Sequence, residues 1–220
     1  EIIRTLNPDL VALQEVDKET ARSSGVDQAA ELGRLTGLKA YFGRAMDHAG
    51  GAYGNAILTN LPLTSRRIHA LPYQPTREPR SALEVHVIVT RDDSPTTIAF
   101  IGTHLDFGPN PLNRFKAVRT LNEVAGSQPD LPMILAGDLN AIPGMPAIDK
   151  LKQQWTDATS GTVVKTYPAP TPRVQIDYIH YGPADCWEVV KTYVPDVSNI
   201  DVASDHRPIV AVLRLKNGGS

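Results

Sequence analysis

Short apolar runs separated by polar turns dominate the hydrophobic pattern of this chain. Residues 10–13, 55–59, 132–136 and 209–213 are apolar runs bounded by polar residues, Gly or Pro, which is typical of buried β-strands. Further extended segments are predicted at residues 39–42, 63–71, 81–90, 96–102, 174–179 and 187–194. The turn at residues 91–95 joins two of these segments and predicts a hairpin.

Helical spacing of apolar residues occurs in only a few segments. Helices are predicted at residues 1–6, 27–36 and 113–127, with a short one within residues 143–155. Asp27 can cap the second helix and Gly37 can close it. The expected core positions are Leu32 and Leu35 in the second helix and Phe115, Val118, Leu121 and either Val124 or Ala125 in the third.

Strands mixed with a few helices, without an internal repeat, favour a mixed α/β sandwich over a regular βαβ series. The chain has 220 residues, of which 41% are hydrophobic, and this size fits one domain with a substantial core. We therefore predict a single domain over residues 1–216. The Asn-Gly-Gly-Ser sequence at residues 217–220 predicts a flexible tail.

Charge and composition exclude some functions and leave others open. The net charge of −2 does not resemble the basic footprint of a sequence-reading nucleic-acid binder, although a metal-assisted nuclease stays possible. The single cysteine, Cys186, excludes an internal disulfide. No apolar run is long enough for a membrane span, and no signal peptide is visible in a chain that opens on Glu1. We expect a monomer, and the compartment stays open between cytoplasmic and, after removal of a signal peptide, secreted or periplasmic.

Polar side chains that could do chemistry follow several of the predicted strands. They are Glu15, His104, Asp138 with Asn140, Asp177, and Asp205 with His206. Loops at strand ends converge in open α/β folds, so these side chains could meet. Carboxylate and amide oxygens suit a hard cation such as Mg²⁺ or Mn²⁺. Residues 204–208, taken alone, are equally consistent with a polar turn before the last strand.

Five short segments together carry a family resemblance. Residues 13–17, 102–106, 137–140, 175–178 and 204–208 read LQEVD, GTHLD, GDLN, QIDY and SDHRP. In this order they resemble the endonuclease/exonuclease/phosphatase superfamily, which has the DNase I-like fold. Each motif is weak alone, but five in order are specific.

The resemblance implies a four-layer α/β/β/α sandwich of two packed mixed β-sheets and metal-dependent hydrolysis of phosphoesters. It assigns Glu15 as the principal metal ligand and Asp205 as a carboxylate near the same Mg²⁺ or Mn²⁺. Asp138 and Asn140 would orient the attacking water and the phosphate. His104 matches a second histidine that stabilises the phosphate or assists the leaving group in some branches.

The resemblance also pairs Asp177 with His206. A carboxylate on one ring nitrogen fixes the tautomer and raises the basicity of an imidazole, so that the other nitrogen can take a proton from water. We therefore expect His206 to be the general base and Asp177 to hold it.

Other positions keep two interpretations. Asn55 matches an Asn near the substrate in the family, or simply begins a strand. Arg80 matches an Arg of bacterial members and either binds phosphate or forms a structural ion pair. We expect Asp17 and Asp106 to be solvated loop ends and Arg114 to lie on a solvated helix face.

One departure from the family pattern concerns the first strand. The family opens with a strand that carries an Asn at the site, whereas this sequence starts in the helix that would follow it. The sheet position beside residues 10–13 should therefore be open, which is costly for a strand edge. A truncated chain or a sequence covering part of the protein is favoured over a strand supplied by another chain. We expect this form to have reduced metal affinity and activity.

The sequence thus predicts a divalent-metal phosphodiesterase or phosphatase. A lipid headgroup or small phosphodiester is slightly favoured as substrate over DNA or RNA, because the chain lacks an evident basic stripe. The alternative from another class is a family-shaped binding domain, or an inactive fragment, without catalysis.

Overall fold

The computed structural model describes residues 1–216, and the tail expected at residues 217–220 lies outside them. The helices are α1 (Ile2–Leu6), α2 (Gln28–Thr36), α3 (Leu112–Gly126) and α4 (Pro146–Leu151), with a 3-10 turn η1 (Ala184–Cys186). The strands are β1 (Leu10–Lys18), β2 (Lys39–His48), β3 (Gly51–Thr59), β4 (Leu63–Leu71), β5 (Arg80–Arg91), β6 (Ser94–His104), β7 (Met133–Asp138), β8 (Thr156–Asp157), β9 (Asp177–Gly182), β10 (Trp187–Tyr193) and β11 (Val210–Leu215).

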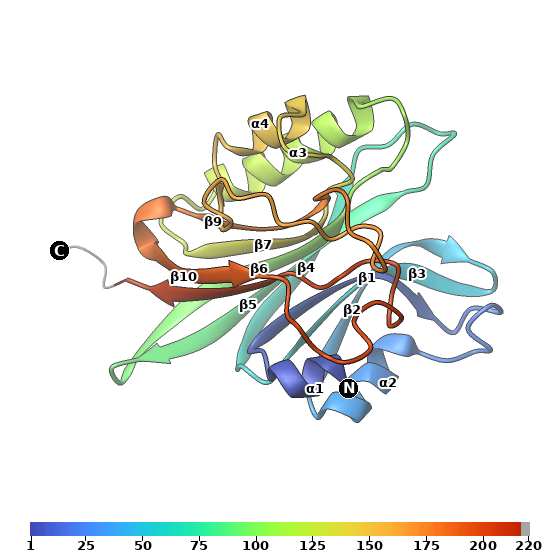
Figure 1. The fold of residues 1–220 in the computed structure, drawn as a ribbon, viewed down its shortest axis with the longest axis horizontal. Helices are drawn as coiled ribbons and strands as arrows, with labels where there is room; N and C mark the ends of the chain where they lie inside the picture. The colour runs from blue at the N-terminus through green and yellow to red at the C-terminus, as the bar shows by residue number, and fades with distance from the viewer. Residues whose placement is uncertain (217–220) are drawn as a thin grey trace.

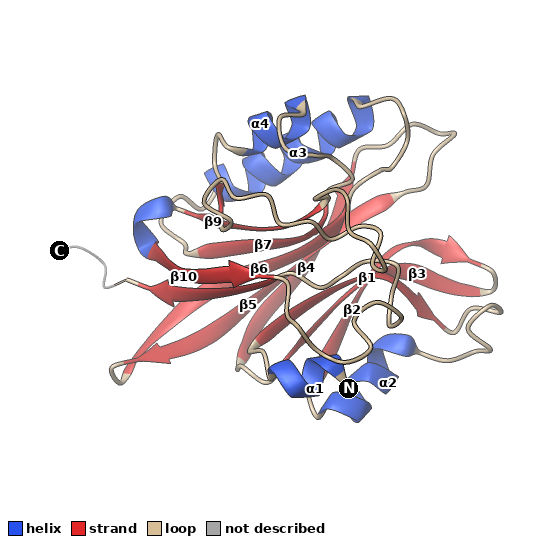
Figure 2. Ribbon diagram, viewed as in Figure 1, coloured by secondary structure: helices blue, strands red, loops and turns tan. Residues whose placement is uncertain are grey.

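The strands form one large sheet and two smaller ones. The large sheet has six strands in the order β4-β5-β6-β7-β9-β8, and only its β6–β7 pair is parallel. A three-stranded antiparallel sheet has the order β1-β3-β2, and β10 pairs with β11. Figures 1 and 2 show these strands between two layers of helices, with α3 and α4 on one side and α1 and α2 on the other.

The two faces of the large sheet bury different sets of side chains. Alternate residues of β5 point to opposite faces, as the pleat requires. Ala82 joins a core cluster with residues of α3 and α4, whereas Leu83 and Val85 join one with Ile57 of β3. On the far side of the small sheet, Ala29 of α2 packs with residues of β1 and β3. The predicted α/β/β/α sandwich is confirmed.

The small sheet and the β10–β11 pair pack on the same face of the large sheet without pairing with each other. Leu10 of β1 and Leu213 of β11 both contact the cluster that contains Leu83. Among the described residues, β1 pairs only with β3, and β11 pairs only with β10. The open edge expected beside residues 10–13 is therefore present on β1.

Several strands differ from the sequence prediction, and three of the differences concern the site or the core. β1 runs through Glu15 to Lys18, with a register shift between Leu13 and Val16 and a positive φ of 56° at Glu15. β9 starts at Asp177, which is therefore the first residue of the strand and not in its middle. β11 was expected to be buried, but it belongs to a two-stranded sheet and its residues alternate between half-buried and exposed.

The predicted core face of α3 is largely confirmed, because Val118, Leu121 and Ala125 are buried, but one predicted core position in each of α3 and α2 is exposed. In α3, Phe115 is 36% exposed, while Asn113 and Arg114 are buried. In α2, Leu35 is 48% exposed and Gly33 is buried. A Cβ at Gly33 would lie 2.9 Å from the backbone oxygen of Leu38. The glycine therefore allows this face of α2 to pack closely against the backbone that follows the helix.

Candidate active site

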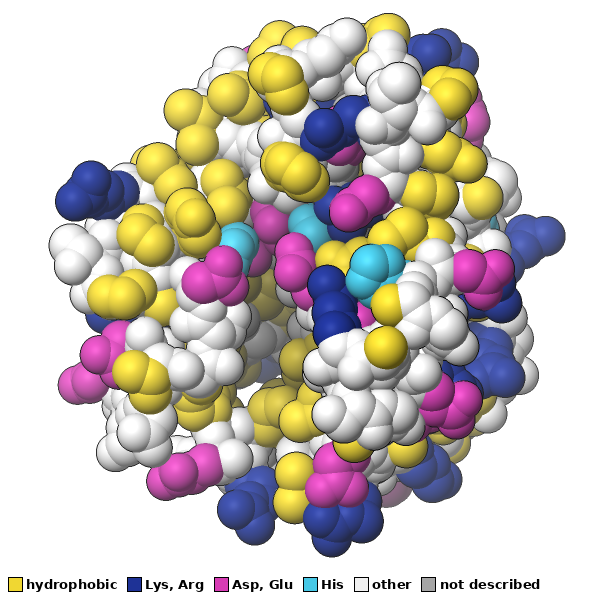
Figure 3. All heavy atoms as spheres, turned by 90° about the vertical axis from the view of Figure 1, so that its right-hand side faces the viewer, with side chains coloured by type: hydrophobic (Ala, Val, Ile, Leu, Met, Phe, Trp, Pro, Cys, Tyr) yellow, Lys and Arg dark blue, Asp and Glu magenta, His cyan; other side chains and the backbone are white. Residues whose placement is uncertain are grey.

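Three of the predicted site residues lie side by side because of strand register. In the parallel β6–β7 pair, His104 lies opposite Asp138. In the antiparallel β7–β9 pair, Asp138 lies opposite Asp177. The row therefore crosses the neighbouring strands β6, β7 and β9 at their ends, on the side of the molecule where Figure 3 shows acidic and histidine side chains in a central hollow.

A glycine allows the strands that carry this row to approach closely. Gly137 precedes Asp138 and has a φ of 152°. A Cβ at this position would lie 1.9 Å from the carbonyl oxygen of Thr103. Any side chain at residue 137 would therefore push β7 away from β6 and disturb the alignment of Asp138 with His104.

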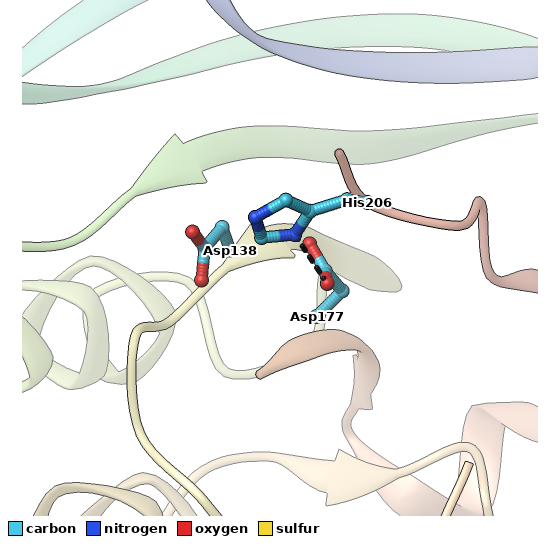
Figure 4. A group of neighbouring side chains, drawn as sticks. All are labelled: Asp138, Asp177 and His206. Carbon is cyan, nitrogen blue, oxygen red and sulfur yellow. Dashed lines mark hydrogen bonds and ion pairs between the residues drawn. The ribbon is translucent and has the colours of Figure 1, made fainter. Parts of the chain in front are cut away.

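His206 completes the group from a distant loop. Its Nδ1 lies 2.8 Å from Oδ2 of Asp177, and Figure 4 shows the imidazole between the carboxylates of Asp138 and Asp177. Ligand atoms of these three residues all lie within 4.8 Å of one another. Burial alone would lower the pKa of His206, but the hydrogen bond and charge of Asp177, together with the charge of Asp138, raise it to about 9.

The Pro- and Thr-rich loop at residues 162–172 holds Asp177 and His206 in place. The buried hydroxyl of Thr166 donates to the same Oδ2 of Asp177 at 2.5 Å. The amide of Arg207 donates to the carbonyl of Thr166 at 2.8 Å, and the amide of Ala169 donates to the carbonyl of Asp205 at 2.7 Å. Sequence reasoning missed Thr166, because nothing in the Pro- and Thr-rich segment indicates which hydroxyl meets a carboxylate.

Asp138 is a buried carboxylate with little to offset its charge. Its Oδ1 accepts from the backbone amide of Asn140 at 2.7 Å. Burial raises the pKa of Asp138 to about 7, and the neighbouring charge of Asp177 acts in the same direction. Two carboxylates this close favour either a proton on Asp138 or a cation bound beside it.

His104 lies on the other side of Asp138. Its Nε2 is 3.5 Å from Asp138 Oδ2 and 3.1 Å from Nδ2 of Asn140. Its Nδ1 is 3.2 Å from Nη1 of Arg80. Burial lowers the pKa of His104 to about 3, and the charge of Arg80 acts in the same direction.

The two residues expected to hold the metal lie at the rim. Glu15 projects from the irregular position of β1, with its side chain 66% exposed and Oε1 3.9 Å from Nδ1 of His104. Asp205 is exposed, and its carboxylate is not part of the cluster formed by Asp138, Asp177 and His206. The structure thus brings the catalytic candidates together and leaves Glu15 and Asp205 beside them.

The two candidate substrate-binding residues are buried. Asn55 is 2% exposed and donates through Nδ2 to the carbonyl of Ser81 at 2.9 Å. Arg80 is 6% exposed, and its Nη2 pairs with Glu78 at 3.0 Å. Both side chains therefore bond to the protein itself.

The expectation that Asp17, Asp106 and Arg114 are solvated was wrong. Each is about 5% exposed or less. Asp17 pairs through both oxygens with Arg22, at 2.7 and 2.9 Å, and Asp106 accepts from Nε of Arg77 at 2.9 Å. Arg114 donates to the carbonyls of Asp106 and Gly108 at 2.8 and 2.6 Å. Such partners offset the cost of burying a charge, and sequence patterns do not reveal them.

These groups fit a hard divalent cation. The carboxylate of Asp138 is an oxygen donor, Glu15 offers another carboxylate at the rim, and Asn140 carries an amide close by. Burial and the charge of Asp177 raise the pKa of Asp138. The described side chains therefore do not fully stabilise the charged form of this carboxylate, and a bound cation would stabilise it.

Comparison with models of known protein families identifies the family of this chain. The model of the endonuclease/exonuclease/phosphatase family matches residues 1–206. The chain belongs to this family. Members of the family are in general hydrolases of phosphoesters, and they typically use a divalent metal. No protein with curated annotation matches the chain significantly.

Solved structures share the fold at low sequence identity. A functionally unknown conserved protein from Enterococcus faecalis V583 has a TM-score of 0.79 and 22% identity, over 98% of this chain and 88% of that one. The Bacteroides thetaiotaomicron mannosyl-6-phosphatase Bt3783 has a TM-score of 0.75 and 17% identity, over 97% and 88%. D. rerio TDP2, complexed with a single-strand DNA product, has a TM-score of 0.72 and 17% identity, also over 97% and 88%.

The helices offer no candidate for a membrane span. None of those within residues 1–216 combines the length and the apolar character that crossing a bilayer requires.

Proposed function

We propose that the protein hydrolyses phosphoesters, with His206 as the general base and a divalent cation bound beside Asp138. The observation that carries the proposal is the hydrogen bond of 2.8 Å between His206 Nδ1 and Asp177 Oδ2, with Asp138 in the same cluster. This arrangement resembles the carboxylate–imidazole pairs that activate water in hydrolases.

The protonation of His206 follows from its neighbour. Asp177 accepts from Nδ1–H, so Nε2 is the nitrogen that takes the proton from the attacking water. Asp177 then stabilises the imidazolium that forms, while Thr166 holds the carboxylate in place. The pKa of about 9 describes His206 facing two carboxylates, and a cation that offsets the charge of Asp138 would lower it towards neutrality.

His104 and Asn140 would lie close to the phosphoryl group. The Asn140 amide nitrogen, which can only donate, lies 3.1 Å from Nε2 of His104 and 3.0 Å from the carbonyl of Leu105, so the two side chains hold each other beside Asp138. From this position His104 would stabilise the phosphate or assist the leaving group.

Glu15, Asp138 and Asn140 would hold the cation, with Asp205 near it. When bound, Mg²⁺ or Mn²⁺ would supply a positive charge that offsets charge on the phosphoryl oxygens and leaving group. The Glu15 side chain is 66% exposed and would have to turn inward to contribute.

The substrate that we propose is a small phosphodiester, a lipid headgroup or a phosphomonoester, in preference to a long nucleic acid. The net charge of −2 is unlike that of proteins whose basic surface neutralises many phosphates, and Figure 3 shows acidic side chains at the centre of the hollow. One neighbour by fold is described as a mannosyl-6-phosphatase and another was solved with a DNA product, so the fold accommodates both kinds.

A phosphoester panel with Mg²⁺ and Mn²⁺ tests the proposal. It should contain a sugar phosphate, an inositol phosphate, sphingomyelin, bis-p-nitrophenyl phosphate and plasmid DNA. We expect cation-dependent turnover of at least one small ester, lost by at least about 10²-fold in His206→Ala. Asp149→Asn is the matched control, because this carboxylate is exposed on α4 and pairs only with Lys152.

The alternative is a family-shaped domain that binds without catalysis, for which the open edge of β1 is the supporting observation. Turnover that is abolished by EDTA and by His206→Ala rejects it. A folded protein that binds neither Mg²⁺ nor Mn²⁺ in calorimetry, and turns over no member of the panel, supports it.

A further inference from the structure

An aromatic ring packs directly against the proposed base. The ring centroids of Tyr167 and His206 lie 4.8 Å apart, and the two ring planes are inclined at 50°. This separation is within the range of favourable aromatic pairs. Tyr167 is 37% exposed, so its ring lies against the imidazole at the surface of the site and not in the core.

Backbone bonds between two loops set these rings opposite each other. The amide of Arg207 donates to the carbonyl of Thr166 at 2.8 Å, and the amide of Ala169 donates to the carbonyl of Asp205 at 2.7 Å. Each residue that carries a ring thus lies between the bonded residues of its own loop. A bond of 2.6 Å from Nε of Arg207 to the carbonyl of Ala169 joins the same two loops once more.

Tyr167 is also tied to the segment that leads into β9. Its backbone forms an antiparallel bridge with Val174, and the amide of each residue donates to the carbonyl of the other at 3.1 Å. Asp177 begins β9 shortly after Val174. The ring that packs against His206 and the carboxylate that accepts from it are therefore anchored by one connected stretch of backbone.

The ring contact supplies a restraint that the hydrogen bond alone lacks. The bond of 2.8 Å to Asp177 fixes the position of Nδ1 of His206, but an imidazole held at one atom can still swing about that atom. The His206 side chain is 25% exposed, so the core does not enclose it. An aromatic ring against its face limits this motion and keeps the other nitrogen directed to one place, as an oriented base requires.

We propose that Tyr167 is a positioning residue whose ring holds the imidazole of His206 in the orientation for taking a proton from water. The part of this inference that concerns catalysis rests on the proposed function. The ring of Tyr167 is the part that acts, and it acts through His206. The hydroxyl, which could instead contact a substrate, is not required.

The effect on His206 can be measured without any activity. In NMR spectra of the metal-free protein and of Tyr167→Phe, nuclear Overhauser contacts should join the rings of residues 167 and 206, and ¹³C relaxation should show a rigid His206 ring. In Tyr167→Leu the His206 ring should become mobile. Phe115→Leu is the matched control, because it removes an aromatic ring of equal exposure, 36%, on α3. Tyr167→Met replaces Tyr167→Leu should the latter fail to fold.

Kinetics then separate positioning from substrate binding. We expect kcat of Tyr167→Leu to fall about 10- to 100-fold, the range for partners that orient a site residue, with KM changed by no more than about twofold. Tyr167→Phe retains the ring, so its kcat should stay within about twofold of that of the unaltered protein. Added to His206→Ala, Tyr167→Leu should cause no further loss, since the group it positions is already absent.

Several results would overturn the inference. These are a loss in Tyr167→Phe as large as that in Tyr167→Leu, a raised KM with unchanged kcat in Tyr167→Leu, a further loss in the double variant, or a His206 ring that stays equally rigid in Tyr167→Leu. A protein that turns over no phosphoester, but whose His206 ring is loosened by Tyr167→Leu and not by Tyr167→Phe, would refute the proposed function and leave the Tyr167–His206 relationship standing.

Discussion

The hydroxyl of Thr166 and the imidazole of His206 donate to the same oxygen of one carboxylate, Asp177 Oδ2, at 2.5 and 2.8 Å. The three residues come from two loops and a strand. Because Thr166 is fully buried, its bond to Asp177 restricts the direction in which the carboxylate meets His206. Thr166 is therefore a supporting residue of the proposed base.

Thr166→Val should slow turnover without preventing folding. Valine preserves the shape of the side chain but removes the donor, so Asp177 can rotate away from His206. We expect kcat to fall by about 10- to 100-fold and unfolding free energy by about 1 kcal/mol. The measurements are steady-state kinetics and urea denaturation. Thr162→Val, at an exposed position of the same loop, is the control, and equal kinetics in the two variants would contradict the role.

The sequence predicted that His104, Asp138 and Asp177 would lie close together because polar residues follow several predicted strands and match the family motifs, and the strand register now accounts for their proximity. Once residues 102–106 and 137–140 are placed on neighbouring parallel strands, His104 must lie beside Asp138. Thr166 was not predictable, because its contact joins residues in separate loops whose paths depend on the whole fold. Arg114 shows a similar limit, since periodicity identified the helix and most of its buried face but not the carbonyls that accept from the buried Arg114.

The pKa of His206 should depend on Asp177 in the metal-free protein. Its folded value of about 9 lies above the ordinary value of 6.5, so this group stabilises the protein fully below pH 6.5, and the contribution is lost as pH rises through about 9. In Asp177→Asn the pKa should fall, because burial then outweighs the remaining charges. A histidine NMR titration with and without Mg²⁺ measures this, and a pKa for His206 that is equal in both proteins would contradict the assignment.

A second buried carboxylate should control acid stability. Glu84 is 3% exposed, and both oxygens accept short bonds of 2.5 Å, from Nε2 of His69 and Nε2 of His86. Burial would raise the pKa of Glu84, but the two histidines lower it from 4.5 to about 2. The stability it contributes is therefore present above pH 4.5 and is lost as pH falls through about 2.

Glu84→Gln should thus be destabilised at neutral pH by up to about 3 kcal/mol, which is the free energy of a shift of this size. The difference from the unaltered protein should shrink as pH falls from 5 towards 2. Denaturation curves across this range measure the effect. Glu123→Gln, at an exposed helix pair with Arg119, should change stability by less than about 0.5 kcal/mol. A deficit of Glu84→Gln that does not change with pH would argue against the two histidines as the cause.

Cation binding should compete with a proton on Asp138. The pKa of this carboxyl is about 7, because it is buried and faces Asp177, whereas a bound cation requires the carboxylate form. Apparent Mg²⁺ affinity should therefore rise between pH 6 and pH 8, and calorimetry in buffers of different ionisation enthalpy should detect proton release on binding. Asp138→Asn should bind more weakly and release fewer protons, while Asp149→Asn should match the unaltered protein. Affinity that stays constant between pH 6 and pH 8, with no proton release, would place the cation away from Asp138.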